Sequence, residues 1–122
     1  MRVIVACGIL KNKHGKILMG LRPSKQPFSG FWEFPGGKLE NDESITDCLK
    51  REWMEELNVN IKIENLIYNN NYKKYSCYFF TGKIIDEENI KKNVHEKIKF
   101  CDIHEIRNLK LFETDYKILD LL

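Results

Sequence analysis

Three glutamates occupy one short stretch of the chain with the spacing of a helix face. Glu52, Glu55 and Glu56 follow a series of apolar residues that step by four, including Ile45 and Leu49. With Ile45 at zero on a helical wheel of about 100° per residue, Leu49 falls near 40° and marks the inward face. Glu52 then falls near −20°, Glu56 near +20° and Glu55 near −80°, an arc of about 100°. The carboxylates therefore overlap the face that the helix is expected to bury.

Such an arrangement costs free energy. Glu52 and Glu56 are like charges at the i, i+4 spacing, and all three glutamates lie in the C-terminal half of the predicted helix, where the helix dipole repels anions. A divalent cation is the simplest compensation, and ligands that are all oxygen favour Mg²⁺ or Mn²⁺. A solvated acidic face without an ion is the alternative interpretation.

The segment before this helix adds a second indication. Gly36 and Gly37 follow Pro35 and let the backbone approach a ligand closely, while Lys38 offers a positive charge to a phosphate. A plain turn explains the glycines equally well. Together with the glutamates, however, the segment favours metal-assisted chemistry on a phosphate chain.

The pattern predicts elements that position these residues. Residues 3–10 and 17–21 read as a hairpin. Asp42 and Ser44 are both good N-caps for a helix of about four turns that stops at Asn58, which tolerates the left-handed conformation. We expect further strands at 59–63, 72–85 and 98–103, a turn at Asn69–Asn71, a loop at 86–93 and a closing helix at 114–122.

Composition limits the class of protein. A chain of 122 residues fits one domain, 1–122, and its net charge of +2 is too small for a protein that wraps a nucleic-acid polymer. The longest apolar run, residues 3–10, is far short of the roughly 20 residues that span a bilayer. The four scattered cysteines favour reduced thiols and a cytoplasmic protein, with no membrane partner.

The glutamates belong to a longer pattern. From Gly37 the chain runs five residues to Glu43 and seven to Arg51 and Glu52, then continues as Trp53-Met54-Glu55-Glu56-Leu57-Asn58-Val59. This resembles the Nudix box at every charged position. The one departure is Asn58 where the family has Gly.

The resemblance extends into the flanking residues. The stretch Trp32–Glu40 is similar to that of MutT-type nucleoside triphosphate pyrophosphohydrolases, which are Nudix enzymes. The fold class that it implies is α/β: a Nudix α/β/α sandwich with a mixed, partly curved sheet between helices. The activity that it implies is release of a nucleoside monophosphate and pyrophosphate by attack of water at the β-phosphorus.

Roles at the metal end follow from the same resemblance. The carboxylates of Glu52, Glu55 and Glu56, with the carbonyl of Gly36, are implied to hold Mg²⁺, for which Mn²⁺ can substitute. Glu52 is the first candidate for the general base. The resemblance also implies that Arg51 pairs with Glu43 and orients the helix carboxylates. A further ligand often comes from a late loop, where the expected register falls on Val94, and Glu96 is an alternative two residues away.

Roles at the substrate end are implied too. Arg22 and Lys38 would neutralise the phosphates, and Phe28 or an aromatic residue of the segment 75–80 would stack on the base. Asp115 aligns with an Asn by which MutT enzymes read oxidised guanine, whereas relatives that prefer cytidine nucleotides carry Asp there. An ordinary N-cap is the other interpretation of Asp115. One face of the first strand would line the base site, with Val3, Val5 and Cys7.

Two classes of function therefore stay open. The first is an enzyme for a small nucleoside triphosphate, either 8-oxo-dGTP in nucleotide-pool sanitation or CTP and modified dCTP. The second is a Nudix-like binding module without turnover, which the intact Glu52, Glu55 and Glu56 disfavour. A monomer and a homodimer are both compatible with the sequence.

Overall fold

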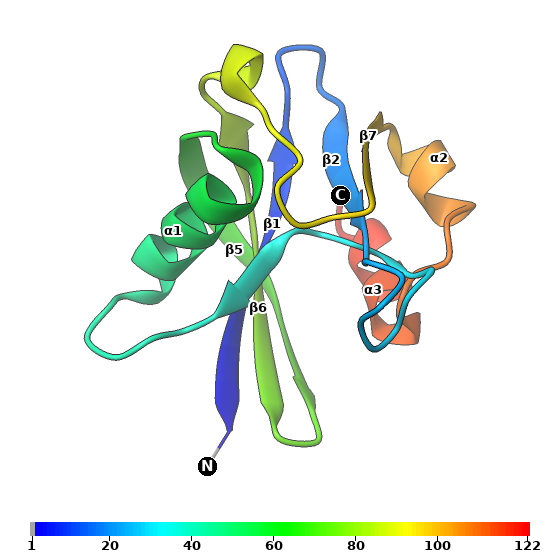
Figure 1. Ribbon diagram of the computed structural model, residues 1–122. Helices are drawn as coiled ribbons and strands as arrows, with labels where there is room; N and C mark the ends of the chain where they lie inside the picture. Colours follow the sequence, from blue (N-terminus) through cyan, green and yellow to red (C-terminus); the bar gives the residue numbers. More distant parts are fainter. Residues whose placement is uncertain (1) are drawn as a thin grey trace.

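The computed structural model describes residues 2–122 and consists of a central sheet with helices on both faces (Figure 1). The described residues form, in chain order, β1 (Val3–Lys11), β2 (Ile17–Leu21), β3 (Trp32–Glu33), β4 (Gly36–Lys38), α1 (Ile45–Leu57), β5 (Ile61–Tyr72), β6 (Tyr75–Ile84), β7 (Lys97–Cys101), α2 (Ile103–Arg107) and α3 (Glu113–Leu119), with a 3-10 turn at Glu87–Asn89.

The sheet is mixed. Its strand order is β3-β2-β1-β6-β5, with β4 added to β1 and β7 added to β2. The β1 and β6 strands run parallel, and the other pairs are antiparallel. Two register shifts interrupt the β5–β6 pairing, and such irregularities bend a sheet locally. The predicted mixed, partly curved sheet between helices is confirmed.

Alternation along β1 divides the core between the two faces of the sheet. Ala6 and Leu10 pack with Trp53 of α1 on one face, whereas Ile9 packs with Ile118 of α3 on the other. All five side chains are fully buried. The apolar face of α1 thus fixes the helix that carries the glutamates to the sheet, and Figure 1 shows this helix lying against the sheet.

The predicted limits of this helix are confirmed. The hydroxyl of Ser44 accepts a hydrogen bond from the backbone N–H of Asp47, which caps α1 at its N-terminus. Asn58 ends the helix with φ 59° and ψ 35°, and its N–H donates to the carbonyl of Met54. Asn at this position therefore fulfils the task that Gly has in the family box.

The predicted turn at Asn69–Asn71 is wrong. The segment Asn69–Asn71 lies inside β5, and the turn falls two residues later, at Lys73 and Lys74. Cross-strand bonds explain the difference, because the Asn69 amide donates to Ser76 Oγ, which in turn donates to Asn71 Oδ1. These side chains satisfy one another within the β5–β6 ladder rather than forming a turn.

The C-terminal region holds a helix that the pattern did not indicate. Strand β7 ends at Cys101, and α2 follows at once, because Asp102 and Glu105 form a reciprocal capping box. The closing helix α3 begins at Glu113 after an N-cap at Phe112 that makes no side-chain bond. The N-cap interpretation of Asp115 is therefore wrong, since this residue lies within the first turn of α3.

Two further expectations concern membranes and disulfides. Within residues 2–122, none of the helices combines the length and the apolar character needed to cross a bilayer. All four cysteines are free thiols.

Candidate active site

The three glutamates of α1 differ in their surroundings. Glu56 is buried, Glu52 is half-buried, and Glu55 is exposed. This order follows the helical wheel, on which Glu56 and Glu52 lie nearest the inward face. We call these three residues the carboxylate face of α1.

Arg51 organises the carboxylate face through one guanidinium group. It donates to Glu43 from both Nε (3.0 Å) and Nη2 (2.9 Å), and from Nη1 to Glu52 (2.9 Å) and Glu55 (3.2 Å). Its Nη2 also donates to the carbonyl of Lys38 at 3.1 Å, which ties α1 to β4. The hydrogen bonds from Arg51 lower the pKa of Glu43 to about 2. Arg51 thus positions three carboxylates, those of Glu43, Glu52 and Glu55.

The Pro35-Gly36-Gly37 segment packs tightly between β1 and α1. A Cβ added to Gly36 would lie 1.8 Å from the carbonyl oxygen of Ala6, and one added to Gly37 would lie 2.2 Å from the Glu52 carboxyl carbon. The indole N–H of Trp53 donates to the carbonyl of Pro35 at 2.9 Å. A side chain at Gly36 would therefore clash with the backbone of β1, whereas one at Gly37 would displace the Glu52 carboxylate from its place.

A cavity of about 280 Å³ opens beside the carboxylate face. We call it the acidic cavity, and its lining consists of Arg22, Pro23, Gln26, Glu33, Gly36, Glu52, Glu55, Glu56 and Val94. Helix α1, the segment from β2 to β4 and the loop before β7 all contribute. Elements far apart in the sequence thus bring the predicted metal ligands Gly36, Glu52, Glu55 and Glu56 together around one hollow.

Two residues at this site, Glu33 and His95, were not predicted from the sequence. Glu33 of β3 accepts hydrogen bonds from Arg22 Nη1 at 2.8 Å and pairs with His95 Nε2 at 2.9 Å. Burial raises the pKa of the Glu33 carboxyl, but the bonds from His95 and Arg22 outweigh it, so that its pKa lies below the usual value. His95 lies on an irregular loop, where no helix or strand periodicity indicates which side chains point inward. The only indication in the sequence is that His95 follows Val94, the position at which a further metal ligand was expected.

Without a bound cation, the ionised form of the Glu56 carboxyl is unfavourable. Burial raises the pKa of Glu56 to about 9, and the neighbouring Glu52 carboxylate adds to the rise. Its Oε2 is buried and has no hydrogen-bond partner within the described residues. An orphaned carboxylate oxygen beside further carboxylates and the Gly36 backbone matches the all-oxygen ligand set that Mg²⁺ and Mn²⁺ prefer. The residues present therefore fit a hard divalent cation.

The two basic candidates for phosphate binding lie differently. Arg22 lines the acidic cavity and is held there by Glu33 and by the carbonyl of Pro27. Lys38 is exposed at the end of β4 and does not line the cavity. The structure thus brings Arg22 to the carboxylates and leaves Lys38 beside them.

Glu96, the alternative metal ligand, is exposed outside the acidic cavity, as Lys38 is. Its side chain is exposed, and its backbone N–H donates to the carbonyl of Leu21 at 2.9 Å. Glu96 does not line the acidic cavity, whereas Val94 does. His95, between them, directs its ring toward Glu33 and Glu56.

Asp115 lies at a second place, on the other side of the sheet from α1. Its side chain is buried in the first turn of α3. Burial raises the pKa of the Cys7 and Cys77 thiols, and the charge of the Asp115 carboxylate adds to the rise. Burial raises the pKa of Asp115 to about 7, and the Glu33 carboxylate adds to the rise. We call Asp115, Cys7 and Cys77 the Asp115 cluster.

The other candidates for the base site are partly exposed. Val3 and Val5 alternate with Ile4 along β1 and are half-buried, like Cys7. Phe28 is 60% exposed at φ 63° and makes edge contacts with Phe31 and Phe112, whose ring precedes α3. An exposed aromatic ring in a left-handed backbone conformation offers a free face for stacking.

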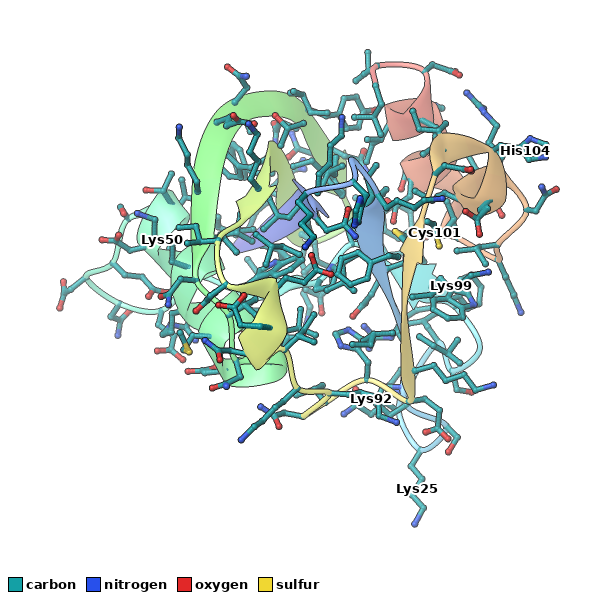
Figure 2. The ribbon with its side chains drawn as sticks, turned by 90° about the horizontal axis from the view of Figure 1, so that it is seen from above. Lys25, Lys50, Lys92, Lys99, Cys101 and His104 are labelled. Atoms are coloured by element: carbon teal, nitrogen blue, oxygen red, sulfur yellow. The ribbon has the colours of Figure 1, made fainter. Side chains whose placement is uncertain are left out.

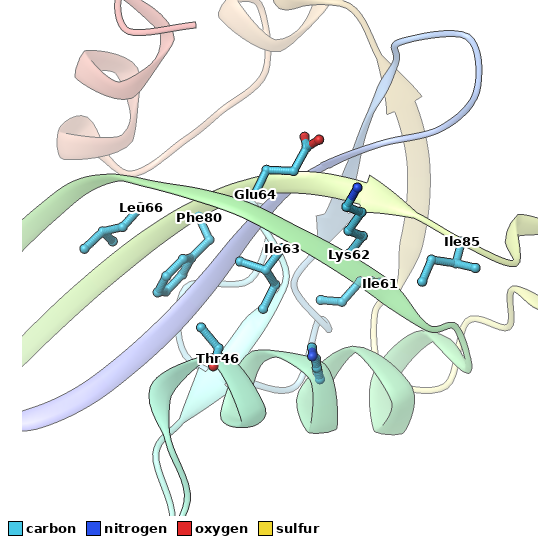
Figure 3. Close-up of a pocket in the computed structure, with 9 residues that line it drawn as sticks. Thr46, Ile61, Lys62, Ile63, Glu64, Leu66, Phe80 and Ile85 are labelled. Atoms are coloured by element: carbon cyan, nitrogen blue, oxygen red, sulfur yellow. The ribbon is translucent and has the colours of Figure 1, made fainter.

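A different hollow, of about 500 Å³, lies between α1 and the β5–β6 ladder (Figure 3). Its lining is largely aliphatic, with Ile61, Ile63 and Leu66, and its charged side chains are those of Lys50, Lys62 and Glu64. It contains a single carboxylate. The chemistry of the three glutamates is therefore confined to the acidic cavity.

The fold and the box define a class. Residues 1–122 match the family model described as NUDIX domain. The chain belongs to the Nudix family, and the expectation of a Nudix hydrolase is confirmed at the level of that family.

Individual relatives add detail. The 8-oxo-dGTP diphosphatase of Proteus vulgaris is 42% identical over 57 residues, which cover 47% of this chain and 51% of that protein. The match thus spans about half the length of that relative. The CTP pyrophosphohydrolase of Escherichia coli K12 is 26% identical over 129 residues, which cover 98% of this chain and 91% of that protein.

A solved structure supports the fold. The structure of MutT described from Aliivibrio salmonicida and Vibrio cholerae superposes with a TM-score of 0.87 at 24% identity, covering 99% of this chain and 96% of that one. The likeness extends over the sheet and all of its helices.

Proposed function

We propose that the protein is a Mg²⁺-dependent nucleoside triphosphate pyrophosphohydrolase that releases a nucleoside monophosphate and pyrophosphate. The observation that carries the proposal is the carboxylate face of α1 beside a cavity, with an orphaned oxygen on Glu56. A bound divalent cation would neutralise phosphate charge and lower the pKa of an attacking water. Mn²⁺ would substitute, since it prefers similar ligands.

The chain's own residues have separate tasks in this proposal. Arg22 binds the phosphate chain from the cavity wall, after exchanging its bond to Glu33 for one to a phosphate oxygen. Lys38 adds positive charge at the cavity rim. Arg51 and Glu43 hold Glu52 in place, and Glu52 is the first candidate to take the proton of the attacking water.

The proposed substrate is 8-oxo-dGTP, with action in nucleotide-pool sanitation. The support is the relation to 8-oxo-dGTP diphosphatases, of which the Proteus vulgaris protein matches the region of the box. Asp115 would read the base, Phe28 would stack on it, and Val3, Val5 and Cys7 would line its site. The free cysteines are consistent with a reducing cytoplasm as the place of action.

A second candidate substrate is CTP or a modified dCTP. One observation favours it: the residue at the proposed base-reading position is a buried acid, Asp115, in a chain that matches a CTP pyrophosphohydrolase over nearly its full length. A carboxylate only accepts hydrogen bonds, whereas its protonated form also donates one, and a base edge distinguishes the two.

A nucleotide panel tests the proposal. We expect 8-oxo-dGTP, dGTP, CTP and dCTP to be hydrolysed with Mg²⁺ and not with chelator, with pyrophosphate as a product in each case. In ¹⁸O-labelled water the label should enter pyrophosphate, because attack falls on the β-phosphorus. Label in the nucleoside monophosphate would place the attack at the α-phosphorus, and nucleotide binding without turnover would identify a binding module.

A further inference from the structure

A buried histidine faces two carboxylates beside the acidic cavity. His95 Nε2 lies 2.9 Å from Glu33 Oε2 and 3.7 Å from Glu56 Oε1. One donor atom from each of the three residues lies within 4.8 Å of the other two. Two of the three residues, Glu33 and Glu56, also line the acidic cavity, so an ion from solution can reach the group through this cavity.

The group has unused bonding capacity. The side chain of His95 is 0% exposed and that of Glu56 is 9% exposed, yet Glu56 Oε2 has no hydrogen-bond partner within residues 2–122. A buried carboxylate oxygen without a partner is costly, because its desolvation is not compensated. The orphaned oxygen belongs to the same carboxylate that faces the imidazole, so a cation there would satisfy it.

The ring of His95 occupies a space made for it. A Cβ added to Gly20 of β2 would lie 2.4 Å from the Cδ2 atom of His95 and 2.6 Å from its Nε2. Gly20 is also the residue that pairs with Glu33 across β2 and β3. The missing side chain at Gly20 therefore lets the imidazole lie directly beside the Glu33 carboxylate.

The loop that carries His95 is fastened on both sides. Before His95, Asn93 donates from its backbone N–H to the carbonyl of Glu56 (3.0 Å) and from its side chain to the carbonyl of Glu55 (3.1 Å). After it, Glu96 donates to the carbonyl of Leu21. The histidine is thus held between the end of α1 and the sheet, and little ordering is needed when a ligand binds.

We propose that Glu33, Glu56 and His95 form a site for a first-row divalent cation, Mn²⁺ through Zn²⁺, with His95 Nε2 as a nitrogen ligand. Carboxylate oxygens alone suit Mg²⁺, whereas an imidazole nitrogen favours transition-metal ions. Both Glu33 Oε2 and His95 Nε2 then bind the cation, so the proton of their mutual hydrogen bond leaves, and the neutral imidazole keeps its one proton on Nδ1. Arg22 keeps its bond to the other oxygen of Glu33.

This site shares Glu56 with the carboxylate face of α1 but does not depend on the proposed hydrolysis. It is a binding property, and it is measured without nucleotide. Failure of hydrolysis therefore leaves the site in place, and absence of nitrogen coordination leaves the proposed hydrolysis in place.

Electron spin-echo modulation of protein-bound Mn²⁺ tests the nitrogen ligand on the unaltered chain. We expect ¹⁴N modulation from a directly bound imidazole, and a change of its frequencies to those of ¹⁵N when the protein is prepared with ¹⁵N-histidine. Mn²⁺ bound at saturation with no histidine modulation would overturn the proposal.

Variants assign the signal to one of the three histidines. His95→Gln should remove the modulation and weaken Mn²⁺ binding, measured by titration calorimetry, by about 10-fold or more, with Mg²⁺ affinity changed much less. His104→Gln is the matched control, because His104 is exposed and points outward from α2 (Figure 2). His14→Gln serves in the same way on the β1–β2 turn. Equal losses for Mn²⁺ and Mg²⁺ in His95→Gln, or an unchanged spectrum, would contradict the assignment.

Discussion

The carboxylate face of α1 and the Asp115 cluster each contain one buried acid, Glu56 and Asp115, but the surroundings of these acids differ. On α1, one helix supplies the glutamates, and Arg51 pairs with Glu52 and Glu55. At the Asp115 cluster, strands β1 and β6 and helix α3 meet, and the neighbours of the acid are the two thiols of Cys7 and Cys77.

The difference shows what each place is able to bind. Several oxygens and a cavity let a cation enter at α1, so the charge can be neutralised from outside. The neighbouring thiols offer Asp115 no cation, and burial instead raises its pKa to about 7, so that the acid is largely protonated below neutral pH. Glu33 links the two places, because its charge acts on both Asp115 and Glu56.

Removing a charge from α1 gives the largest expected effect. Glu56→Gln should lower kcat by at least about 10²-fold, because a lost ligand charge displaces the cation. Melting curves should show that Mg²⁺ stabilises the parent protein more than the variant, while in chelator the variant is at least as stable, since it removes the acid whose ionisation burial and Glu52 disfavour.

Glu88→Gln provides a matched control, since Glu88 is an exposed glutamate of the 3-10 turn. It should leave kcat and the Mg²⁺ effect on melting as they are. Near-normal turnover in a folded Glu56→Gln protein would contradict the view that a cation neutralises the carboxylates of α1, and with it the contrast to Asp115.

Asp115→Asn should act on selectivity rather than on metal dependence. An amide exchanges an acceptor for a donor at the base edge, and a mismatched buried polar contact costs about 1 to 3 kcal/mol, or roughly 5- to 150-fold. We expect kcat/KM for 8-oxo-dGTP, dGTP, CTP and dCTP to change in rank, with the Mg²⁺ requirement unchanged. Parallel changes for all four nucleotides would separate Asp115 from base recognition.

The same substitution should flatten the dependence of stability on pH. Because burial raises the pKa of folded Asp115 to about 7 from 3.8, the unfolded chain releases its proton first as pH rises. The acid therefore lowers the free energy of unfolding by about 2 kcal/mol between about pH 5 and pH 7, and it has no such effect below about pH 4.

Urea unfolding at several pH values measures this contribution. The difference in unfolding free energy between Asp115→Asn and the parent protein should grow with pH in this window and level off above about pH 7. Asp47→Asn, an exposed acid in the first turn of α1, should show no such growth. A constant difference across the window would mean that Asp115 is ionised in the folded protein.

The smallest effect is expected for a change that weakens the start of α1 and leaves the carboxylates in place. Ser44→Ala removes the bond that caps α1 and should cost about 1 kcal/mol of stability. Nucleotide ranking should stay as it is, because the cap lies at the far end of the helix from Glu56. A change in ranking would show that the two acidic places are coupled through α1.

The sequence predicted the arrangement of the carboxylate face on α1 because that geometry is local. Helical periodicity alone orients Glu52 and Glu56, and the fixed spacing of the box joins Arg51 to Glu43 eight residues away. Ser44 and Asn58 limit the helix by side-chain and backbone preferences that are visible in single residues.

The remainder depends on contacts between distant segments. Glu33 and His95 are 62 residues apart, and nothing in the spacing of either residue indicates that they meet. Asn69–Asn71 has the composition of a turn, but cross-strand bonds to Ser76 keep it in β5. In such places tertiary contacts outweigh local preference.

The end of α1 has a consequence for how the protein opens. The carbonyls of Glu55, Glu56 and Leu57, which a free helix leaves to water, accept hydrogen bonds from Asn93 and Lys91 in the loop before β7. The amide hydrogens of Lys91 and Asn93 should thus exchange slowly although they lie outside helices and strands. Loop and helix end then open as one cooperative unit, so that the last turn of α1 and the segment carrying His95 share a single exchange rate.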